Sequence, residues 1–109
     1  MTTKETFGQL IKKLREEHRL PLRKVASVLD IDPSTLSKIE RGERSGNKDM
    51  IRKLSELFTT DATDLSVVLL SDKVANDLFS EECSNEVLRV AKEKIQYLRA
   101  RTVQQGMIK

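Results

Sequence analysis

The chain has 109 residues, of which 38% are hydrophobic and 34% are charged, and its net charge at pH 7 is +3. This length allows one small domain with at most an appendage, and the single cysteine, Cys83, excludes an intramolecular disulfide and any multi-cysteine zinc site. No apolar run approaches the roughly 20 residues that span a bilayer, and the N-terminus lacks the apolar core of a signal peptide. We therefore expect a cytoplasmic protein that does not associate with membranes.

The first predicted element is an amphipathic helix that begins after Thr6 and ends near His18. Its apolar side is marked at helical spacing by Phe7, Leu10, Ile11 and Leu14. Thr6 is a residue type that commonly caps a helix N-terminus. At the other end, His18 suits the negative end of the helix dipole, so we interpret it as a structural residue rather than a ligand.

Two short helical segments follow, separated by a break at residues 30–32. The first segment has one apolar face, formed by Leu22, Val25, Ala26 and Leu29. Asp32 is a good N-cap for the second segment, and Pro33 suits its first helical position, where the missing N–H costs nothing.

The second segment has an inner and an outer face. Leu36 and Ile39 point back toward the first segment, which leaves hydrogen-bonding and basic side chains outside: Ser34, Thr35, Ser37, Lys38 and Arg41. A helix that enters a DNA major groove requires such a face. Residues 1–58 also hold 13 lysines and arginines against 9 acidic residues, a net of +4, whereas residues 59–109 hold 7 against 8, a net of −1. We therefore predict a helix-turn-helix in the basic half, where phosphates would bind.

A loop over residues 42–47 leads to two further predicted helices. Asn47 is expected to cap the first of them, whose apolar residues are Met50, Ile51, Leu54, Leu57 and Phe58. Thr63 or Asp64 is expected to cap the second, whose inward side is formed by Leu65, Val68 and Leu69.

The apolar pattern changes at residues 71–72. The preceding stripe would need apolar residues near positions 72, 73 and 76, but the apolar residues move instead to Val74, Ala75, Leu78 and Phe79. Either the helix breaks here, or it continues and turns a new face to a different partner. A connection at residues 80–84 then leads to a last helix from about Asn85 to Thr102, and the tail, residues 103–109, is expected to fray.

We accordingly divide the chain into a DNA-binding domain, residues 1–70, and a helical extension, residues 71–109. The extension carries its own apolar surface at Val74, Leu78, Leu88, Ala91, Ile95 and Leu98. We interpret it as a helical hairpin that buries this surface against a second subunit. An intrachain cap over the fourth and fifth helices is the alternative, and the seam is too short to predict a coiled coil.

The segment before the extension resembles the Xre/Cro-like helix-turn-helix regulators. The most specific part is the run LSKIERG, residues 36–42, and further matches are Leu20, Val25, Ala26, Ile31 and Ser34. The resemblance covers about residues 6–70 and implies an all-α, five-helix, lambda-repressor-like domain. Three positions depart from the family pattern: Pro21 replaces a capping Ser or Thr, Leu22 replaces a Gln that contacts phosphate, and Asp30 replaces a turn Gly. Asp tolerates the left-handed conformation, so we expect the turn to be kept.

Base contacts are expected from the N-terminal part of the recognition helix, because only that end reaches the groove floor. They are Ser34, Thr35, Ser37 and Lys38, together with Arg44, which matches a family position at the groove edge. Phosphate contacts are expected from Arg23, Lys24, Arg41, Asn47 and Lys48. Glu40 is expected to orient Arg41 or a neighbouring loop, and Cys83 to be an inert free thiol.

The predicted function is sequence-specific regulation of transcription by a homodimer on a roughly palindromic double-stranded operator. Among the small members of the family, which include phage-type repressors and antitoxins, restriction–modification controller proteins fit best. The alternative is an antitoxin or anti-regulator whose extension binds a partner protein. One histidine, one cysteine and the lack of a glycine-rich phosphate loop or metal-ligand spacing predict no enzymatic activity, no metal and no cofactor.

Overall fold

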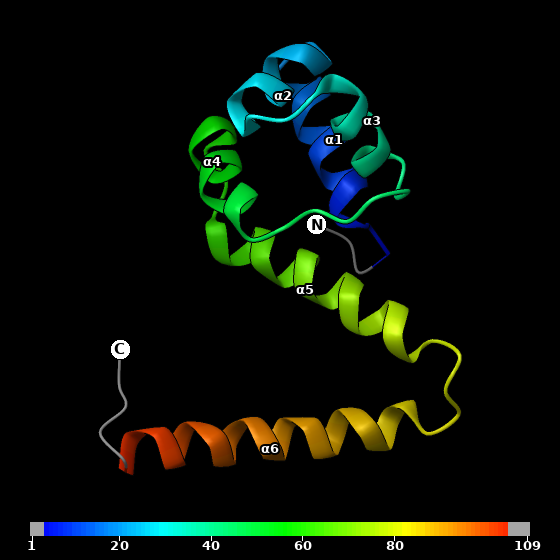
Figure 1. Ribbon diagram of the computed structural model, residues 1–109, viewed down its shortest axis with the longest axis vertical. Coiled ribbons are helices and arrows are strands. Elements are labelled where there is room, and N and C mark those ends of the chain that lie inside the picture. Colours follow the sequence, from blue (N-terminus) through cyan, green and yellow to red (C-terminus); the bar gives the residue numbers. More distant parts are fainter. Residues whose placement is uncertain (1–3, 105–109) are drawn as a thin grey trace. The chain divides into compact units, whose positions relative to one another are not determined.

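The computed structural model describes residues 4–104, and all regular structure in this range is helical (Figure 1). The six helices are α1 (Phe7–Glu17), α2 (Leu22–Leu29), α3 (Pro33–Glu40), α4 (Asp49–Phe58), α5 (Ala62–Leu78) and α6 (Ser84–Gln104). The chain divides into two compact units, Met1–Ala75 and Asn76–Lys109. The predicted all-α fold with a helical extension is confirmed.

One hydrophobic core holds α1 to α5 together. Helix α2 packs on α3 and α4, and α1 packs on α3. The inward positions predicted for the five helices are confirmed, since the buried apolar residues are Phe7, Leu10, Ile11, Val25, Ala26, Leu29, Leu36, Ile39, Met50, Ile51, Leu54, Phe58, Leu65, Val68 and Leu69. Four other predicted apolar residues are partly buried against this core: Leu14, Leu22, Ile31 and Leu57.

Helices α1 and α3 approach so closely that their contact depends on a glycine. A Cβ atom placed on Gly8 would lie 2.0 Å from the backbone oxygen of Ile39 and 3.1 Å from the Cα of Glu40. No side chain fits at this position without moving one helix, because the nearest atoms are backbone. Gly8 therefore sets the distance between α1 and α3.

The N-terminus of α1 is closed by two sets of hydrogen bonds. The predicted Thr6 cap is confirmed and forms a capping box, in which the Thr6 side chain accepts from the Gln9 N–H and the Gln9 side chain accepts from the Thr6 N–H. In addition, the Phe7 N–H donates to Asp72 Oδ2 at 2.7 Å. Asp72 thus has a structural partner at the point where the sequence pattern of α5 becomes polar.

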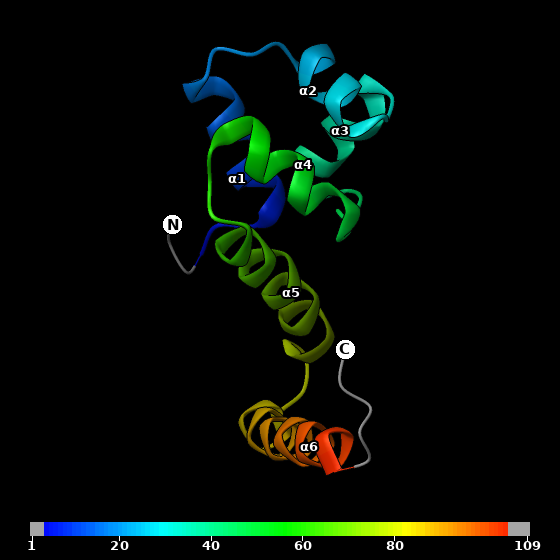
Figure 2. The same ribbon diagram turned by 90° about the vertical axis from the view of Figure 1, so that its left-hand side faces the viewer.

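Helix α5 continues through residues 71–72, so the helix does not break where its apolar pattern changes (Figure 2). The predicted boundary between residues 70 and 71 therefore falls inside a helix, and the compact units divide after Ala75. The predicted cap of α5 is wrong, because Thr63 and Asp64 lie within the helix, and Asp61 Oδ1 accepts from the Thr63 N–H at 2.7 Å. The prediction for Asn47 is partly right: Lys48 occupies the N-cap position of α4, but Asn47 Oδ1 accepts from the Met50 N–H at 3.2 Å.

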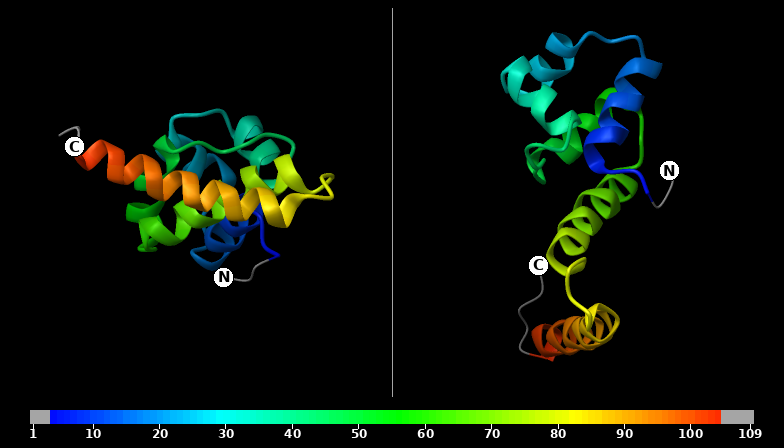
Figure 3. Two further views of the ribbon diagram at one scale, coloured as in Figure 1. Left: turned by 90° about the horizontal axis from the view of Figure 1, so that it is seen from below. Right: turned by 90° about the vertical axis from the view of Figure 1, so that its right-hand side faces the viewer.

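In the second unit, α6 is one uninterrupted helix (Figure 3). It begins at Ser84, one residue before the predicted start, and continues through Gln104, two residues into the tail that was expected to fray. The rest of that tail lies outside the described residues. None of the helices between residues 4 and 104 combines the length and apolar composition that crossing a bilayer requires.

We expect Gly8→Ala to lower the free energy of unfolding by about 2–3 kcal/mol, because the added methyl group overpacks the contact between α1 and α3. The matched control is Gly42→Ala, where φ is +79° and no atom lies within 4 Å of the added Cβ. There only the backbone conformation opposes the change, at about 1 kcal/mol. Urea unfolding of both variants measures the difference, and equal losses would contradict the close approach.

Candidate nucleic-acid interface

The turn between α2 and α3 is held by a left-handed residue. Asp30 has φ 58° and ψ 43°, which confirms that Asp takes the conformation that Gly usually supplies. The Ile31 N–H donates to the Ala26 oxygen at 3.0 Å, and Pro33 occupies the start of α3, as predicted. The prediction for Asp32 is only partly right: it occupies the N-cap position, but its side chain makes no capping hydrogen bond.

Helix α3 separates its side chains as the sequence predicted. Leu36 and Ile39 are buried in the core. On the opposite side, Ser34 and Lys38 are exposed, and Thr35 and Ser37 are half-buried. The outer face therefore presents two hydroxyl groups at intermediate depth between an exposed hydroxyl and an exposed ammonium group.

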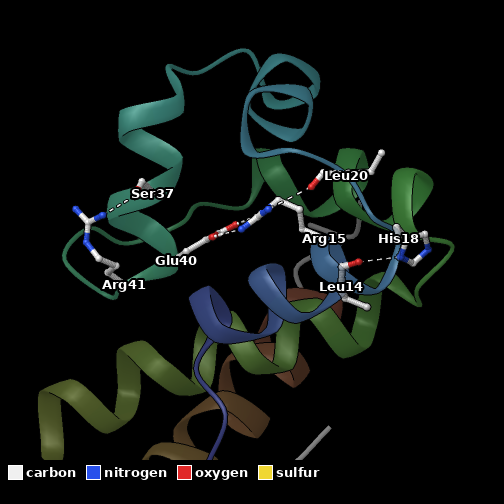
Figure 4. Close-up of polar contacts among 7 residues, drawn as sticks. All are labelled: Leu14, Arg15, His18, Leu20, Ser37, Glu40 and Arg41. Atoms are coloured by element: carbon white, nitrogen blue, oxygen red, sulfur yellow. Dashed lines mark hydrogen bonds and ion pairs between the residues drawn. The ribbon is translucent and has the colours of Figure 1, made fainter.

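The C-terminal end of α3 is fixed by a largely buried ion pair between Arg15 and Glu40 (Figure 4). Arg15 Nε donates to Glu40 Oε2 at 2.8 Å and Nη2 donates to Oε1 at 3.0 Å, while Nη1 donates to the Leu20 oxygen at 3.2 Å. The two side chains are 15% and 6% exposed. The hydrogen bonds to Glu40 raise the pKa of Arg15 above its ordinary value. One guanidinium group thus connects α1, α3 and the loop before α2.

This pair corrects the role predicted for Glu40. Its carboxylate does not reach Arg41, and it acts on the loop at Leu20 only through Arg15. The helical period alone places Arg15 away from the apolar side of α1, and only the packing of α1 on α3 brings its guanidinium group to Glu40.

Arg41, a predicted phosphate contact, is already paired on the surface. Its guanidinium donates to Glu43 Oε2 at 2.6 Å and Oε1 at 3.4 Å. Arg41 Nη1 also donates to the Ser37 hydroxyl oxygen, a contact that Figure 4 shows. These hydrogen bonds and the charge of Arg41 lower the pKa of Glu43 below its ordinary value. Glu43 is therefore ionised at neutral pH. Its carboxylate accepts the Arg41 N–H groups that a phosphate oxygen would otherwise accept.

Arg44, a predicted base contact, lines an open hollow at the N-terminal end of α3. The hollow is formed by Ser27, Asp30, Ile31, Asp32, Thr35 and Arg44. Sequence analysis did not foresee that two carboxylates, of Asp30 and Asp32, share this hollow with Arg44. Carboxylates repel phosphate but accept hydrogen bonds from cytosine N4, so the surroundings of Arg44 suit a base edge better than the DNA backbone.

The remaining predicted contacts lie at two helix starts. Arg23 and Lys24 are exposed in the first turn of α2, whose N-cap, Pro21, makes no side-chain hydrogen bond. Asn47 and Lys48 are exposed just before α4, although Asn47 uses its Oδ1 atom in the cap. All four are thus available at the surface of the first unit.

The single histidine and the single cysteine show no sign of a functional role. His18 caps α1, with Nδ1 2.8 Å from the Leu14 oxygen and its ring centroid 5.0 Å from that of Phe58. The prediction that His18 is structural is therefore confirmed. Cys83 is an exposed free thiol. Within residues 4–104, no group of three or more His, Cys, Asp and Glu side chains is placed to hold a metal ion.

The predicted dimerisation residues are distributed over α5 and α6. Val74, Leu88, Ile95 and Leu98 are exposed, whereas Leu78 and Ala91 are half-buried. Sequence analysis missed that Val67 and Leu70 are exposed as well. Their spacing with Val74 was a usable signal, but in the run VVLL every residue is apolar, which hid the second stripe.

The segment that contains α2, its turn and α3 matches a known protein family. The family described as helix-turn-helix matches residues 11–65, from α1 into α5. The chain belongs to the Xre/Cro-like helix-turn-helix family. A helix-turn-helix binds DNA by laying its second helix in the major groove. In this chain the second helix of the motif is α3. Family membership therefore supports a DNA-binding regulator of transcription.

One curated relative comes from Thermococcus kodakarensis and is provisionally named an HTH-type transcriptional regulatory protein. This helix-turn-helix chain is 32% identical to it over 71 residues. The matched segment is 65% of this chain but only 22% of the relative's length.

We expect Glu40→Ala to lower the free energy of unfolding by about 3 kcal/mol, because it leaves the Arg15 guanidinium buried without its counter-charge. Glu43→Ala is the matched control, since it removes an exposed carboxylate from a similar arginine pair and should leave the unfolding midpoint unchanged. Thermal and urea unfolding measure both. Similar midpoints for the two variants would mean that the buried pair does not fix α3.

Proposed function

We propose that this protein regulates transcription as a homodimer bound to a roughly palindromic double-stranded operator. The observation that carries the proposal is α3, which has its inner side in the core and its outer side lined by Ser34, Thr35, Ser37 and Lys38. In a twofold dimer, two copies of α3 would enter successive major grooves about 34 Å apart.

Base recognition is proposed for these four side chains and for Arg44. Hydroxyl groups donate or accept at several bases, and the Thr35 methyl group can contact a thymine methyl. Arg44 and Lys38 can donate to guanine O6 and N7. The carboxylates beside Arg44 support a base contact, because they would oppose a phosphate at this position.

Phosphate binding is proposed for Arg23, Lys24, Arg41, Asn47 and Lys48. Arg23 and Lys24 lie beside the N–H groups at the start of α2, which suit an anion. Contacts of this kind position the protein without reading sequence, so these residues set affinity and register.

The finer role that we propose is a restriction–modification controller protein. This assignment rests on the family resemblance. The selection experiment below tests it, since the recovered operator should lie upstream of restriction or modification genes.

The exposed apolar side chains of α6 favour a second candidate, an antitoxin or anti-regulator whose extension binds another protein. Purification of the protein by itself separates the two. A stable, monodisperse dimer supports self-association, whereas aggregation that a neighbouring gene product relieves supports the second candidate.

The proposed function is tested by selecting bound sequences from a random pool of double-stranded DNA at two salt concentrations. We expect a symmetric motif whose half-sites lie about one helical turn apart. Recovery of sequence-blind binding that only weakens with salt would overturn the proposal of a specific operator.

On the selected operator, Arg44→Ala should weaken binding by roughly 1–3 kcal/mol and relax the preference at one or two base pairs. Lys24→Ala is the matched control, because loss of a phosphate contact should weaken operator and random DNA alike. If Arg44→Ala also weakens both DNAs equally, Arg44 contacts the backbone rather than a base.

Glu43→Gln should strengthen binding to random DNA several-fold, because it frees Arg41 for a phosphate. A double-variant cycle distinguishes this from a general loss of negative charge. In an Arg41→Ala background the gain should disappear, and a gain that persists there would show that Glu43 does not act through Arg41.

A further inference from the structure

Arg44 lies in the loop between α3 and α4, residues 41–48, which is secured firmly only at its start. There the chain leaves α3 by a Schellman motif, in which the Glu43 N–H donates to the Lys38 oxygen at 2.9 Å and Gly42 has a φ of 79°. The next three residues have no such support. Between residues 4 and 104, no backbone–backbone hydrogen bond connects any of them to the rest of the chain.

Gly46 brings this loop against the hydrophobic core. It is buried, although Ser45 and Asn47 on either side of it are exposed. A Cβ atom placed on Gly46 would lie 2.5 Å from Cε2 and 2.8 Å from Cδ2 of the Phe7 ring, and 3.6 Å from Leu69 Cδ1. Its φ is not in the left-handed region, so glycine is needed here for space and not for backbone conformation.

The Phe7 ring, on which the loop lies, is itself held from two other helices. Phe7 is only 2% exposed, and its N–H donates to Asp72 Oδ2 on α5 at 2.7 Å. The next residue, Gly8, lies against the backbone of Ile39 on α3. Phe7 is thus fixed by α5 and α3 together, whereas the loop above it borders solvent.

An added methyl group at Gly46 would therefore move the loop rather than the ring. Carbon atoms in contact lie about 3.5 Å apart or more, so the contact of 2.5 Å requires a displacement of about 1 Å. Groups that recognise a ligand must be held to within about 0.5 Å. Arg44 is only two residues away and exposed, so it would move with the loop.

We propose that Gly46 is a positioning residue for base recognition: by lying flat on the Phe7 ring, it sets how far Arg44 reaches toward the major groove. Asp72 contributes indirectly, because it holds Phe7 in place. The inference rests on the proposed function, in which Arg44 contacts a base. If Gly46 only improved packing, its substitution would lower stability and leave the base preference unchanged.

The experiment selects bound sequences from random double-stranded DNA with the full chain carrying Gly46→Ala. We expect the preference to relax at the same base pairs as in Arg44→Ala, operator binding to fall about fivefold, and binding to random DNA to change by less than about twofold. In an Arg44→Ala background, Gly46→Ala should alter operator binding by less than about twofold, because the side chain that it displaces is already absent.

A compensating change tests the contact itself. Phe7→Leu removes the ring atom nearest to the added methyl group, so in the Gly46→Ala chain it should return the base preference and most of the operator affinity. Phe7→Leu alone is the reference for this pair. A preference that stays relaxed in the double variant would contradict the contact with Phe7.

Two control variants separate positioning from stability. Ser45→Ala changes the same loop without entering the core, and Leu57→Ala removes a partly buried side chain of α4, outside the loop. Both should keep the base preference at temperatures where circular dichroism shows a folded chain. If Gly46→Ala does not fold, Asp72→Ala replaces it: it releases Phe7 without adding an atom and should relax the same base pairs.

A measurement without DNA completes the test. The amide NMR resonances of residues 43–47 should shift in Gly46→Ala and return in the double variant with Phe7→Leu. Unchanged loop resonances, or an unchanged base preference with lower stability, would overturn the positioning role. A wild type that selects no motif would instead refute the proposed function, and the loop resonances alone would then decide whether Gly46 sets the position of Arg44.

Discussion

The position of the recognition helix depends on the buried pair of Arg15 and Glu40. One guanidinium group binds the carboxylate at the end of α3 through two hydrogen bonds and the backbone before α2 through a third. A planar, bidentate pair restricts rotation as well as distance. Together with the close approach at Gly8, it fixes how α3 is turned relative to α1, and therefore which side chains of α3 face outward.

Most of the fold could be predicted from the sequence because the information is local. Buried residues such as Leu36 and Ile39 recur at the helical period, and the Thr6 cap lies next to the helix that it closes. The failures concern choices that local patterns leave open. Asp61 and Asp64 are both good caps three residues apart, and only the folded chain selects Asp61. The partner of Glu40 lies 25 residues away, beyond what periodicity can indicate.

For the candidate site, too, the sequence predicts some features and not others. Its outer face follows from the inward direction of Leu36 and Ile39, so its members could be named from the sequence. The hydrogen-bond partners of these residues could not be predicted from the sequence. Arg41 and Glu43 are close in sequence, but the pairing that occupies Arg41 and the Ser37 hydroxyl depends on how the chain turns after α3. The carboxylates of the hollow around Arg44 likewise come together only when the turn at Asp30 forms.

The hydrogen bond from Phe7 to Asp72 has a consequence for synthesis of the chain. Its two partners are 65 residues apart, one at the start of α1 and the other in α5. At 5–20 residues per second, a ribosome needs roughly 3–13 s to make the chain between them. During this interval the first backbone donor of α1 has only water as its acceptor. The first helix to be made therefore gains this acceptor only after most of the DNA-binding unit has been synthesised.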